Sequence, residues 1–493
     1  MTHPIRSADK EIPGPQSGTW LVRRRRIAAF AEDSVGLSTR LFTEFGPIVA
    51  LTRRHGERLY SPLGECPGIF LSYGSEAFKQ AANRHDTYGK FPLTGQLFAK
   101  RGTSGRTEPL NHFLTGLFGV NGEAHRQHRR LLMPAFHKQR LEAYAQETVR
   151  ISESFLRDWQ TGTQRDVAAD MQLLTMRIAT KTLFGEDVGN SGAGTGGLLR
   201  EAMRFSSHWL TAALPWDMPG LPYHRFLNAV SVYEREMRGI IQRKRALGQE
   251  GNDVLSMLLH AQDADSGARL TEDEVLGHVG VLFAAGHETS ANALTWTLFL
   301  LSQYPEVARD LLDELEGTLR GGTPGPEHLD RLPFLERVVQ ESMRVLPPVP
   351  WNARVLLGAT ELGGFELPAG AELWLSIFQT HRSPDLFPEP AKFLPARWES
   401  AQPGPFDYVP FSAGPRMCIG AGFAMLETRL ILAMLLQRFR FEIVEGAAID
   451  RAGIVVLAPR RGMPMRLCHR DSSANKTVPT AKGNIRELVE LPG

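Results

Sequence analysis

The chain has 493 residues, of which 42% are hydrophobic and 22% are charged, with a formal net charge of +2 at pH 7. This composition is that of an ordinary soluble globular protein with a large core, and its balanced charge gives no indication of a nucleic-acid partner. The three cysteines, Cys66, Cys418 and Cys468, exclude a disulfide framework and fit a reducing, cytoplasmic compartment.

The N-terminal part of the chain shows no targeting or anchoring signal. Residues 1–12 are polar and are expected to form a tail. The apolar stretch Ile27–Phe30, which follows the basic run Arg23–Arg26, is far too short for a signal peptide. We therefore expect a protein without a membrane anchor.

The rest of the chain is predicted to be mainly α-helical with a small β portion. Long helical patterns alternate with loops rich in glycine and small polar residues. Runs with strand character are few, and they are Ile48–Thr52, Gly68–Ser72, Ala371–Ser376 and Phe439–Ile443. We expect one large domain over residues 13–470 and a flexible C-terminal tail over residues 471–493.

A basic segment, Gly122–Arg130, is predicted to open an amphipathic helix. His125 and Arg129 lie four positions apart and therefore share one face of that helix. Together they are suited to clamp a carboxylate group. The simpler interpretation of the segment is a solvated basic face.

The segment Leu270–Ser302 is predicted to contain a long buried helix. Thr271 and Glu274 have the spacing of a capping box, so the helix is expected to begin there. The apolar stretch that follows is long enough to span a bilayer, but its histidines and its acid argue for a central helix beside a polar cavity. A glycine inside a helix costs about 1 kcal/mol relative to alanine, so Gly286 is interpreted as a local widening that admits a small ligand.

An acid and an alcohol stand side by side in the middle of this helix. Glu288 and Thr289 can pass protons from solvent to a bound oxygen species. Two structural alternatives stay open here. The Thr289 hydroxyl can be bonded to the carbonyl four residues earlier, and Glu288 can be a paired core charge.

Glu341 and Arg344 occupy positions i and i+3 of a predicted helix, where a carboxylate and a guanidinium group can pair. A second arginine, Arg397, follows in the segment Phe393–Trp398. The alternative to one buried charge network is a set of separate surface pairs.

The segment Phe411–Gly420 places one cysteine, Cys418, in a glycine-rich loop with Arg416 two positions before it. An apolar stretch, Phe423–Leu436, follows and is predicted to be a buried helix. Glycines in such a loop let a flat cofactor approach the backbone and free amides to hydrogen-bond the sulfur. A buried structural cysteine in a turn is the alternative.

The segment Phe411–Gly420 resembles the cysteine-ligand loop of the cytochrome P-450 family, the haem-thiolate monooxygenases. The stretch Ala285–Ser290 resembles the oxygen-activating segment of the same family, although Glu288 stands where many relatives have aspartate.

The remaining motifs agree with this resemblance. Glu341, Arg344 and Arg397 are similar to the family's charge triad, which has a structural role. The four motifs, from the basic helix to the cysteine loop, run in the family's order. The resemblance covers about residues 13–467.

The resemblance implies a cytochrome P-450 fold of the soluble bacterial type, with a single large haem-binding domain. It implies haem b (heme, iron protoporphyrin IX) as the cofactor, with the Cys418 thiolate as the metal ligand. Thr289 and Glu288 would be the catalytic pair that delivers protons. The residues expected to contact the cofactor are His125, Arg129, Ala285, Gly286, Arg354, Phe411, Gly414, Arg416, Cys418 and Gly420.

The implied reaction inserts one oxygen atom from O2 into a hydrophobic substrate, by hydroxylation or epoxidation. The sequence shows no flavin or iron–sulfur signature, so the electrons are expected from a separate ferredoxin or flavodoxin with its reductase. Arg126, Arg130 and Arg416 are expected to form a basic face for such an acidic partner.

Family analogy assigns the substrate cavity to Tyr88–Gly119, Phe205–Pro222, Pro347–Trp351 and Val455–Ala458. The side chains of these segments are mostly apolar or aromatic. We expect a sizeable hydrophobic substrate such as a fatty acid, terpenoid, carotenoid or polyketide. Three cations in the first segment are candidates to meet a carboxylate: Lys90, Lys100 and Arg101.

Two other functions stay open. One is a haem-thiolate peroxygenase or rearrangement enzyme, against which the proton route through Thr289 and Glu288 argues. The other is a non-enzymatic haem protein, either a gas sensor or an electron carrier. The sequence shows no output domain for a sensor.

Overall fold

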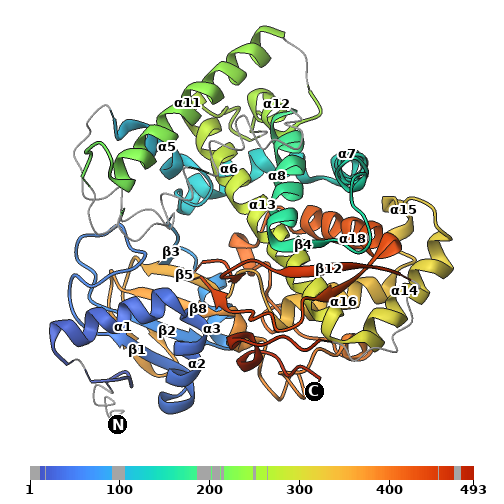
Figure 1. Ribbon diagram of the computed structural model, residues 1–493. Helices are drawn as coiled ribbons and strands as arrows, with labels where there is room; N and C mark the ends of the chain where they lie inside the picture. The colour runs from blue at the N-terminus through green and yellow to red at the C-terminus, as the bar shows by residue number, and fades with distance from the viewer. Residues whose placement is uncertain are drawn as a thin grey trace.

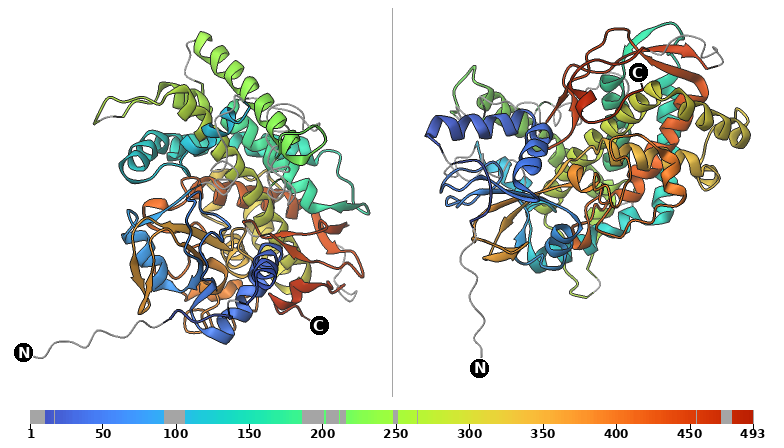
Figure 2. Two further views of the ribbon diagram at one scale, coloured as in Figure 1. Left: turned by 90° about the vertical axis from the view of Figure 1, so that its left-hand side faces the viewer. Right: turned by 90° about the horizontal axis from the view of Figure 1, so that it is seen from below.

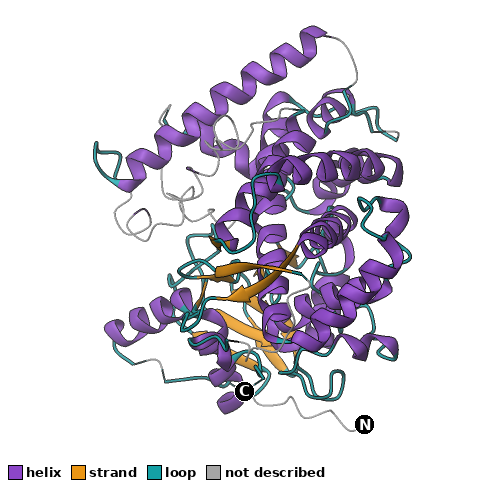
Figure 3. Ribbon diagram, turned by 45° about the vertical axis from the view of Figure 1, so that its right-hand side comes forward, coloured by secondary structure: helices purple, strands orange, loops and turns teal. Residues whose placement is uncertain are grey.

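The computed structural model describes residues 11–16, 18–91, 106–185, 201, 211, 216–247, 251–263, 265–453, 455–470 and 479–492. These residues form a helical part around one long helix and a smaller sheet part that contains the N-terminal strands (Figure 1). The view coloured by secondary structure shows the strands gathered in one region of the molecule (Figure 3). The predicted mainly α fold with a small β portion is confirmed.

Helices make up most of the described chain. The α-helices are α1 (Trp20–Glu32), α2 (Ser34–Phe45), α3 (Ser75–Asn83), α5 (Glu108–Thr115), α6 (Gly122–Leu132), α7 (Lys138–Leu156), α8 (Val167–Phe184), α11 (Pro222–Leu247), α12 (Val254–His260), α13 (Glu272–Gln303), α14 (Pro305–Leu319), α15 (Pro326–Leu329), α16 (Pro333–Val345), α17 (Ile377–Thr380) and α18 (Ala421–Arg438). Short 3₁₀ turns are η1 (Met133–Phe136), η3 (Pro395–Glu399), η4 (Gly414–Arg416) and η5 (Asn484–Glu487).

The largest sheet has five strands in the order β1-β2-β8-β5-β3. β2 and β8 run parallel, and the other neighbours run antiparallel. These strands are β1 (Ile48–Thr52), β2 (Ile69–Tyr73), β3 (Tyr88–Gly89), β5 (Trp351–Leu356) and β8 (Glu372–Ser376). Nearly all of their residues are buried, which explains why β1 and β2 are largely apolar in the sequence, whereas the longest strand, β5, also buries the polar Asn352 and Arg354.

Three smaller sheets complete the β structure. A three-stranded sheet has the order β4-β12-β9, and two hairpin-like pairs join β6 to β7 and β10 to β11. Their strands are β4 (Gln164–Asp166), β6 (Thr360–Leu362), β7 (Phe365–Leu367), β9 (Phe439–Ile443), β10 (Arg451–Ala452), β11 (Ala458–Pro459) and β12 (Pro464–His469). The predicted strands Ile48–Thr52 and Phe439–Ile443 match β1 and β9 in both bounds.

The central helix α13 begins where its capping box predicts. The Thr271 side chain accepts a hydrogen bond from the Glu274 amide at 3.3 Å, and the Glu274 carboxylate accepts one from the Thr271 amide at 2.8 Å. The helix packs against α5, α8, α16 and α18, so it crosses the core of the helical part. Its buried residues from Val275 onward explain the apolar run. Among the helices that the structure describes, none is long and apolar enough to cross a membrane.

The expectation of a flexible tail over residues 471–493 is wrong for residues 479–492. Ile485, Leu488 and Val489 are buried in the main core. Arg451 forms ion pairs with Glu487 of this segment at 2.7 Å and with Asp33 before α2 at 2.8 Å. Figure 2 shows the C-terminal segment near α2 from two further sides. The short apolar patch therefore covers core surface, while residues 471–478 lie outside the described residues.

Glu341, Arg344 and Arg397 form one buried charge network. Both Glu341 oxygens accept hydrogen bonds from Arg344, at 2.8 and 2.9 Å, and one also accepts from Arg397 at 2.9 Å. The Trp398 indole and the Leu394 amide add two further bonds to the same carboxylate, each of 2.9 Å. The predicted triad is confirmed, and the alternative of separate surface pairs is excluded.

This network holds the segment that leads to the cysteine loop. Arg344 donates to the backbone carbonyls of His381, Pro390 and Lys392 at 2.9 to 3.0 Å. Further along, the Tyr408 hydroxyl donates to the Gln340 carbonyl of α16 at 2.9 Å. The chain between α17 and the cysteine loop is thus tied to one helix by buried polar contacts.

We predict that Glu341→Gln lowers the free energy of unfolding by roughly 3–5 kcal/mol, because it leaves two buried guanidinium groups without their counter-charge. The matched control is Glu399→Gln, which removes the exposed ion pair with Arg337 and should cost about 0–1 kcal/mol. Urea unfolding followed by circular dichroism measures both. Equal, small losses in the two variants would contradict a structural role for the network.

Candidate functional site

The cysteine loop has a tight backbone that leaves one thiol accessible. The Cys418 amide donates to the Phe411 carbonyl at 2.8 Å, and the Met417 amide donates to the Gly414 carbonyl at 2.9 Å. α18 begins three residues after Cys418. The side chain of Cys418 is exposed, so the alternative of a buried structural cysteine is excluded.

Glycine occupies the two loop positions, Gly414 and Gly420, for different structural reasons. Gly414 has a φ of +66°, and a Cβ there would lie 2.7 Å from the Cβ of Ala82 on α3. This position therefore needs glycine for its backbone and for packing against α3. A Cβ at Gly420 would lie 3.8 Å from the Phe136 ring, which is an ordinary contact. The Gly420 amide instead hydrogen-bonds the Cys418 sulfur.

The electrostatic surroundings of Cys418 suit a metal-bound thiolate. Desolvation by the surrounding protein raises the pKa of its thiol, while the Gly420 amide, Lys90 and Arg129 act to lower it. A thiol in such a place gains its anionic form when a metal ion binds, because the ion supplies the missing positive charge.

One face of α13 opens in the middle of an otherwise buried helix. Gly286 is exposed there, and Leu282, Ala285 and Thr289 beside it are half-buried. A Cβ added at Gly286 would meet no atom within 4 Å. The predicted local widening of the helix is wrong, because α13 stays α-helical through this position. The open space lies beside the helix and has room for a ligand.

The acid–alcohol pair, Glu288 and Thr289, lies on the open stretch of α13. The structure supports the back-bonded alternative for Thr289 but not the paired-charge alternative for Glu288. The Thr289 hydroxyl donates to the Ala285 carbonyl at 2.6 Å, as the back-bonded alternative expected. The lone pairs of this oxygen are still available to accept a hydrogen bond. Glu288 has no ion-pair partner among the described residues, and burial raises the pKa of its carboxyl group. The paired-charge alternative for Glu288 therefore finds no support.

Basic residues from three elements converge near Cys418. Arg354 on β5 is buried; it donates to Asn352 and to the Ala353 carbonyl, while its Nε has no hydrogen-bond partner among the described residues. Arg416 donates to the carbonyls of Leu117 and Val120, at 3.1 and 2.7 Å. Desolvation lowers the pKa of both arginines to about 10, and for Arg416 the charge of Arg354 adds to this effect.

His125 and Arg129, the two residues predicted to clamp a carboxylate, differ in charge. His125 is buried on α6, and desolvation together with Arg416 and Arg129 lowers its pKa to about 3. It is therefore a neutral ring. Arg129 donates to the Met417 carbonyl at 2.8 Å, so it also supports the cysteine loop. The predicted clamp contains one charge and one neutral hydrogen-bonding ring.

These residues fit a cofactor with two carboxylate groups. Within the described chain, no acidic side chain forms an ion pair with Arg354, Arg416 or Arg129. Buried cations normally have a counter-charge, and a buried donor without a partner calls for an explanation. An anionic ligand that reaches the Nε of Arg354 would supply both a counter-charge for the cations and a hydrogen-bond acceptor for this donor. With the exposed thiol of Cys418, this donor set suits a dianionic metal macrocycle.

Sequence reasoning missed the residue that joins these groups. The Asn121 side chain accepts hydrogen bonds from Arg416 at 2.7 Å and from the Lys90 amide at 2.9 Å, and it donates to the Lys90 carbonyl at 2.9 Å. Asn121 directly precedes α6, where asparagine is a common helix cap. Its side chain makes no cap hydrogen bond, so the available sequence signal points to a different role.

The positions predicted to line a substrate cavity are only partly described. Residues 92–105, 202–210 and 212–215 lie outside the described residues, which includes Lys100 and Arg101. Trp216 is exposed to 58%. Val349 and Val456 are half-buried.

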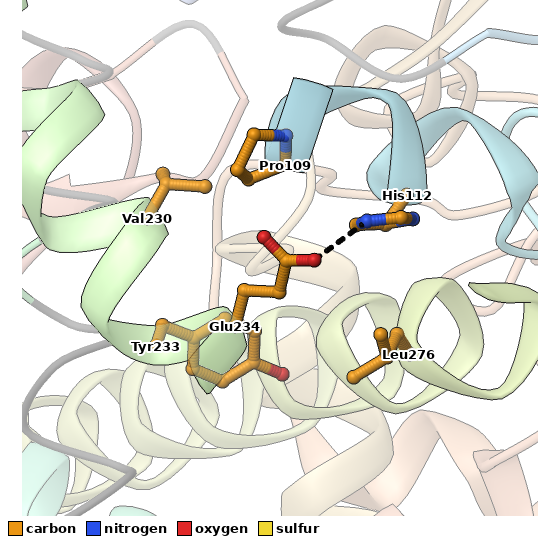
Figure 4. A pocket seen from close by; sticks show the side chains of 6 residues that line it. All are labelled: Pro109, His112, Val230, Tyr233, Glu234 and Leu276. Carbon is orange, nitrogen blue, oxygen red and sulfur yellow. Dashed lines mark hydrogen bonds and ion pairs between the residues drawn. The ribbon is translucent and has the colours of Figure 1, made fainter. Parts of the chain in front are cut away.

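A small cavity lies elsewhere in the helical part, between α5, α11 and α13 (Figure 4). Its lining includes His112 and Glu234, whose side chains are 3.0 Å apart, with Tyr233 and Leu276 below them. Its volume is about 10 Å³, which has room for about one water molecule. It is too small to be a substrate site.

The basic face expected for a redox partner is largely neutralised within the chain. Arg126 pairs with Glu123 at 2.7 Å, and Arg130 pairs with Asp263 at 3.0 Å. Arg416 points into the site. Acidic neighbours on α6 and before α13 therefore compensate two of the three charges of the expected basic face, and docking of a redox partner there stays a prediction.

A second buried acid lies next to the open face of α13. Glu427 on α18 is buried, and its side chain is hydrogen-bonded to Ser290, the neighbour of Thr289. Burial raises the pKa of Glu427 to about 8. The carboxyl group is therefore mostly protonated at neutral pH in the folded protein.

Comparison with known proteins gives a consistent result. Residues 69–463 match the cytochrome P-450 family. The chain is 33% identical to a cyclooctat-9-en-7-ol 5-monooxygenase of Streptomyces melanosporofaciens over 66% of this chain and 73% of that protein. It is 30% identical to a cytokinin hydroxylase of Arabidopsis thaliana over 85% of this chain and 82% of that protein.

Solved structures show the same fold. The structure of a retinoic acid-bound cyanobacterial CYP120A1 superposes with a TM-score of 0.78 at 25% identity, covering 94% of this chain and 100% of that one. A cytochrome P-450 haem domain with 22% identity also has a TM-score of 0.78 and covers 93% of this chain. The predicted cytochrome P-450 fold is confirmed.

We predict that Glu427→Gln removes a pH dependence of stability. The folded-state pKa of Glu427 is about 8 and its ordinary value is 4.5, so the unfolded chain loses this proton first as the pH rises. The wild-type free energy of unfolding should fall, relative to that of the variant, by up to about 1.4 kcal/mol per pH unit between these values. Urea titrations at several pH values measure the difference. A difference that is constant from pH 5 to 8 would contradict the assignment.

Proposed function

The chain belongs to the cytochrome P-450 family of monooxygenases, and we propose that it inserts one oxygen atom from O2 into a hydrophobic small molecule. The observation that carries this proposal is the combination of one exposed thiol with a buried arginine, Arg354, and two half-buried arginines, Arg129 and Arg416, that have no acidic partner in the described chain. The open face of α13 adds room for O2 and substrate near an acid and an alcohol.

The cofactor proposed for this site is haem b, with the Cys418 thiolate as its metal ligand. Arg354 and Arg416 would hold its carboxylates, with Arg129 and His125 beside them. Phe411, Gly414 and Gly420 shape the loop around the sulfur, and Ala285 and Gly286 would face the other side. Thiolate-ligated haem, when bound, supplies the activation of O2 and the transfer of one oxygen atom.

The protein's own residues would manage protons and water in this reaction. Burial raises the pKa of Glu288, so this half-buried carboxyl group can carry a proton nearer to neutral pH. Thr289 donates to the Ala285 carbonyl and can accept a hydrogen bond from a ligand at the same time. Rotation of its hydroxyl would let Thr289 donate instead. We propose that Glu288 takes up protons and that Thr289 positions them.

The electrons would come from a separate ferredoxin or flavodoxin with its reductase. A docking face near the cysteine loop would rely little on Arg126 and Arg130, because their charges are compensated. Met417 in that loop and Met133 after α6 are exposed large apolar side chains. We propose a cytoplasmic enzyme whose haem-binding domain includes residues 13–470 and also the packed residues 479–492.

The substrate class is proposed from the lining and the relatives together. The described positions are mostly apolar, with Lys90 as a charged exception, and two similar proteins are named for cyclooctat-9-en-7-ol and cytokinin, while a structural neighbour holds retinoic acid. We propose a hydrophobic substrate from the terpenoid, carotenoid, fatty acid or polyketide classes. A screen that compares product formed with O2 consumed tests this function. Rapid turnover with peroxide alone, and none with reduced ferredoxin, would favour a peroxygenase.

We predict that Cys418→Ala protein is purified with little haem and has no activity, because the metal ligand is gone. Cys468→Ala serves as the matched control, since that cysteine lies on β12. The ratio of haem to protein absorbance measures loading. Full haem loading of Cys418→Ala, at a level equal to Cys468→Ala, would contradict ligation by Cys418.

We predict that Thr289→Ala keeps its haem but releases more of the consumed O2 as hydrogen peroxide, because proton delivery is disturbed. The control is Thr295→Ala, which removes the same kind of back-bonded hydroxyl one and a half turns further along α13, in a buried position. Product and peroxide formed per reducing equivalent are the measurement. Unchanged coupling in Thr289→Ala would exclude the proton-positioning role.

A further inference from the structure

Lys90 stands next to the proposed carboxylate site but belongs to none of the matched family motifs. It follows β3 directly and is half-buried. Its Nζ lies 4.6 Å from the centre of the Phe118 ring, a cation–π contact that keeps the charge in place. Within the described chain, it forms no ion pair with an acidic side chain.

The backbone of Lys90 is fixed by a residue that also fixes Arg416. Asn121 bonds both the amide and the carbonyl of Lys90, each at 2.9 Å, and it accepts a bond from the Arg416 guanidinium at 2.7 Å. The position of Lys90 relative to Arg416 is therefore set by one side chain. Such a double clamp is typical of a residue whose side chain must reach a defined place.

The electrostatic surroundings of Lys90 favour an anion at its Nζ. Desolvation and the charges of Arg354 and Arg416 lower its pKa to about 7, and only Cys418 acts in the other direction. A partly desolvated cation that feels two arginine charges, with no carboxylate of the described chain paired to it, is destabilised. A ligand carboxylate would stabilise all three charges at once.

The number of cations also exceeds what the family motifs require. Arg129, Arg354 and Arg416 already provide three positive charges for the two carboxylates of the proposed cofactor. Lys90 adds a fourth, from an element that no motif covers. A lysine ammonium is a compact charge on a flexible stem, which suits a single carboxylate oxygen better than a bidentate fork.

We propose that Lys90 is a carboxylate-binding residue at the edge of the cofactor site. This inference rests on the proposed function. The carboxylate can come from two sources, a propionate group of the haem or an acidic head group of the substrate. The chemistry at Nζ is the same in both cases, so the experiment must separate the sources.

The variants are Lys90→Met, which keeps the apolar stem and removes the charge, and Lys90→Arg, which restores the charge. Lys79→Met on α3 applies the same substitution to an exposed lysine and is the matched control. Each holoprotein is first checked for the thiolate signature in its reduced, carbon-monoxide-bound spectrum. A wild-type protein without that signature would refute the proposed function itself, separately from the role of Lys90.

The first arm measures the transfer of haem from each holoprotein to excess apomyoglobin. If Lys90 binds a propionate, Lys90→Met should lose haem about tenfold faster than wild type, in line with one charge-assisted hydrogen bond. Lys90→Arg and Lys79→Met should stay near the wild-type rate.

The second arm titrates the holoproteins with hexadecanoic acid and with its methyl ester, following the haem spectrum. If Lys90 binds a substrate carboxylate, wild type should prefer the acid over the ester, and Lys90→Met should lose about tenfold in affinity for the acid alone. A faster haem loss or a lost acid preference each supports the proposal and identifies the source. Unchanged haem transfer, together with the same acid-to-ester ratio in wild type and Lys90→Met, would overturn it.

Discussion

The arrangement of the site depends on one electrostatic constraint, a cluster of one buried and several half-buried cations that no acidic side chain of the described chain neutralises. Arg354 and Arg416 are desolvated and repel each other, and the Nε of Arg354 has no partner. Such groups destabilise a fold unless an anion joins them. An anionic cofactor that binds only the folded state would therefore contribute directly to stability by linkage. The charges of Lys90 and Arg129 also act to lower the pKa of the Cys418 thiol, so the same cluster of cations would favour both an anionic cofactor and the thiolate form of the proposed metal ligand.

Distant parts of the chain must meet to bring these cations close to Cys418, and polar contacts hold those parts together. Asn121 joins the end of β3 to the cysteine loop. The Glu341 network ties α16 to the segment that leads into the same loop. Gly414 lets the loop approach α3 closely. Each of these contacts sets where a charge or the sulfur of Cys418 lies.

Several elements of the fold could be predicted from the sequence because the signals for them are local and strong. The capping box at Thr271, the apolar strand Ile48–Thr52 and the cysteine loop each depend on residues close together in the chain. Cross-chain roles were harder to predict. Asn121 was missed, and the segment around Ile485 was expected to be a tail, because their partners are far away in sequence. The packing of Gly414 against Ala82 could not be predicted either, since only the fold brings α3 against the loop.

We propose that Cys418 ligates a haem as a thiolate close to Arg129, Arg354, Arg416 and Lys90. The most direct measurement is the difference spectrum of the purified, reduced protein with and without carbon monoxide. Ligation by the Cys418 thiolate predicts the strongly red-shifted Soret band of a thiolate-ligated haem. A band at the shorter wavelength of histidine- or thiol-bound haem, persisting in fresh preparations, would contradict it.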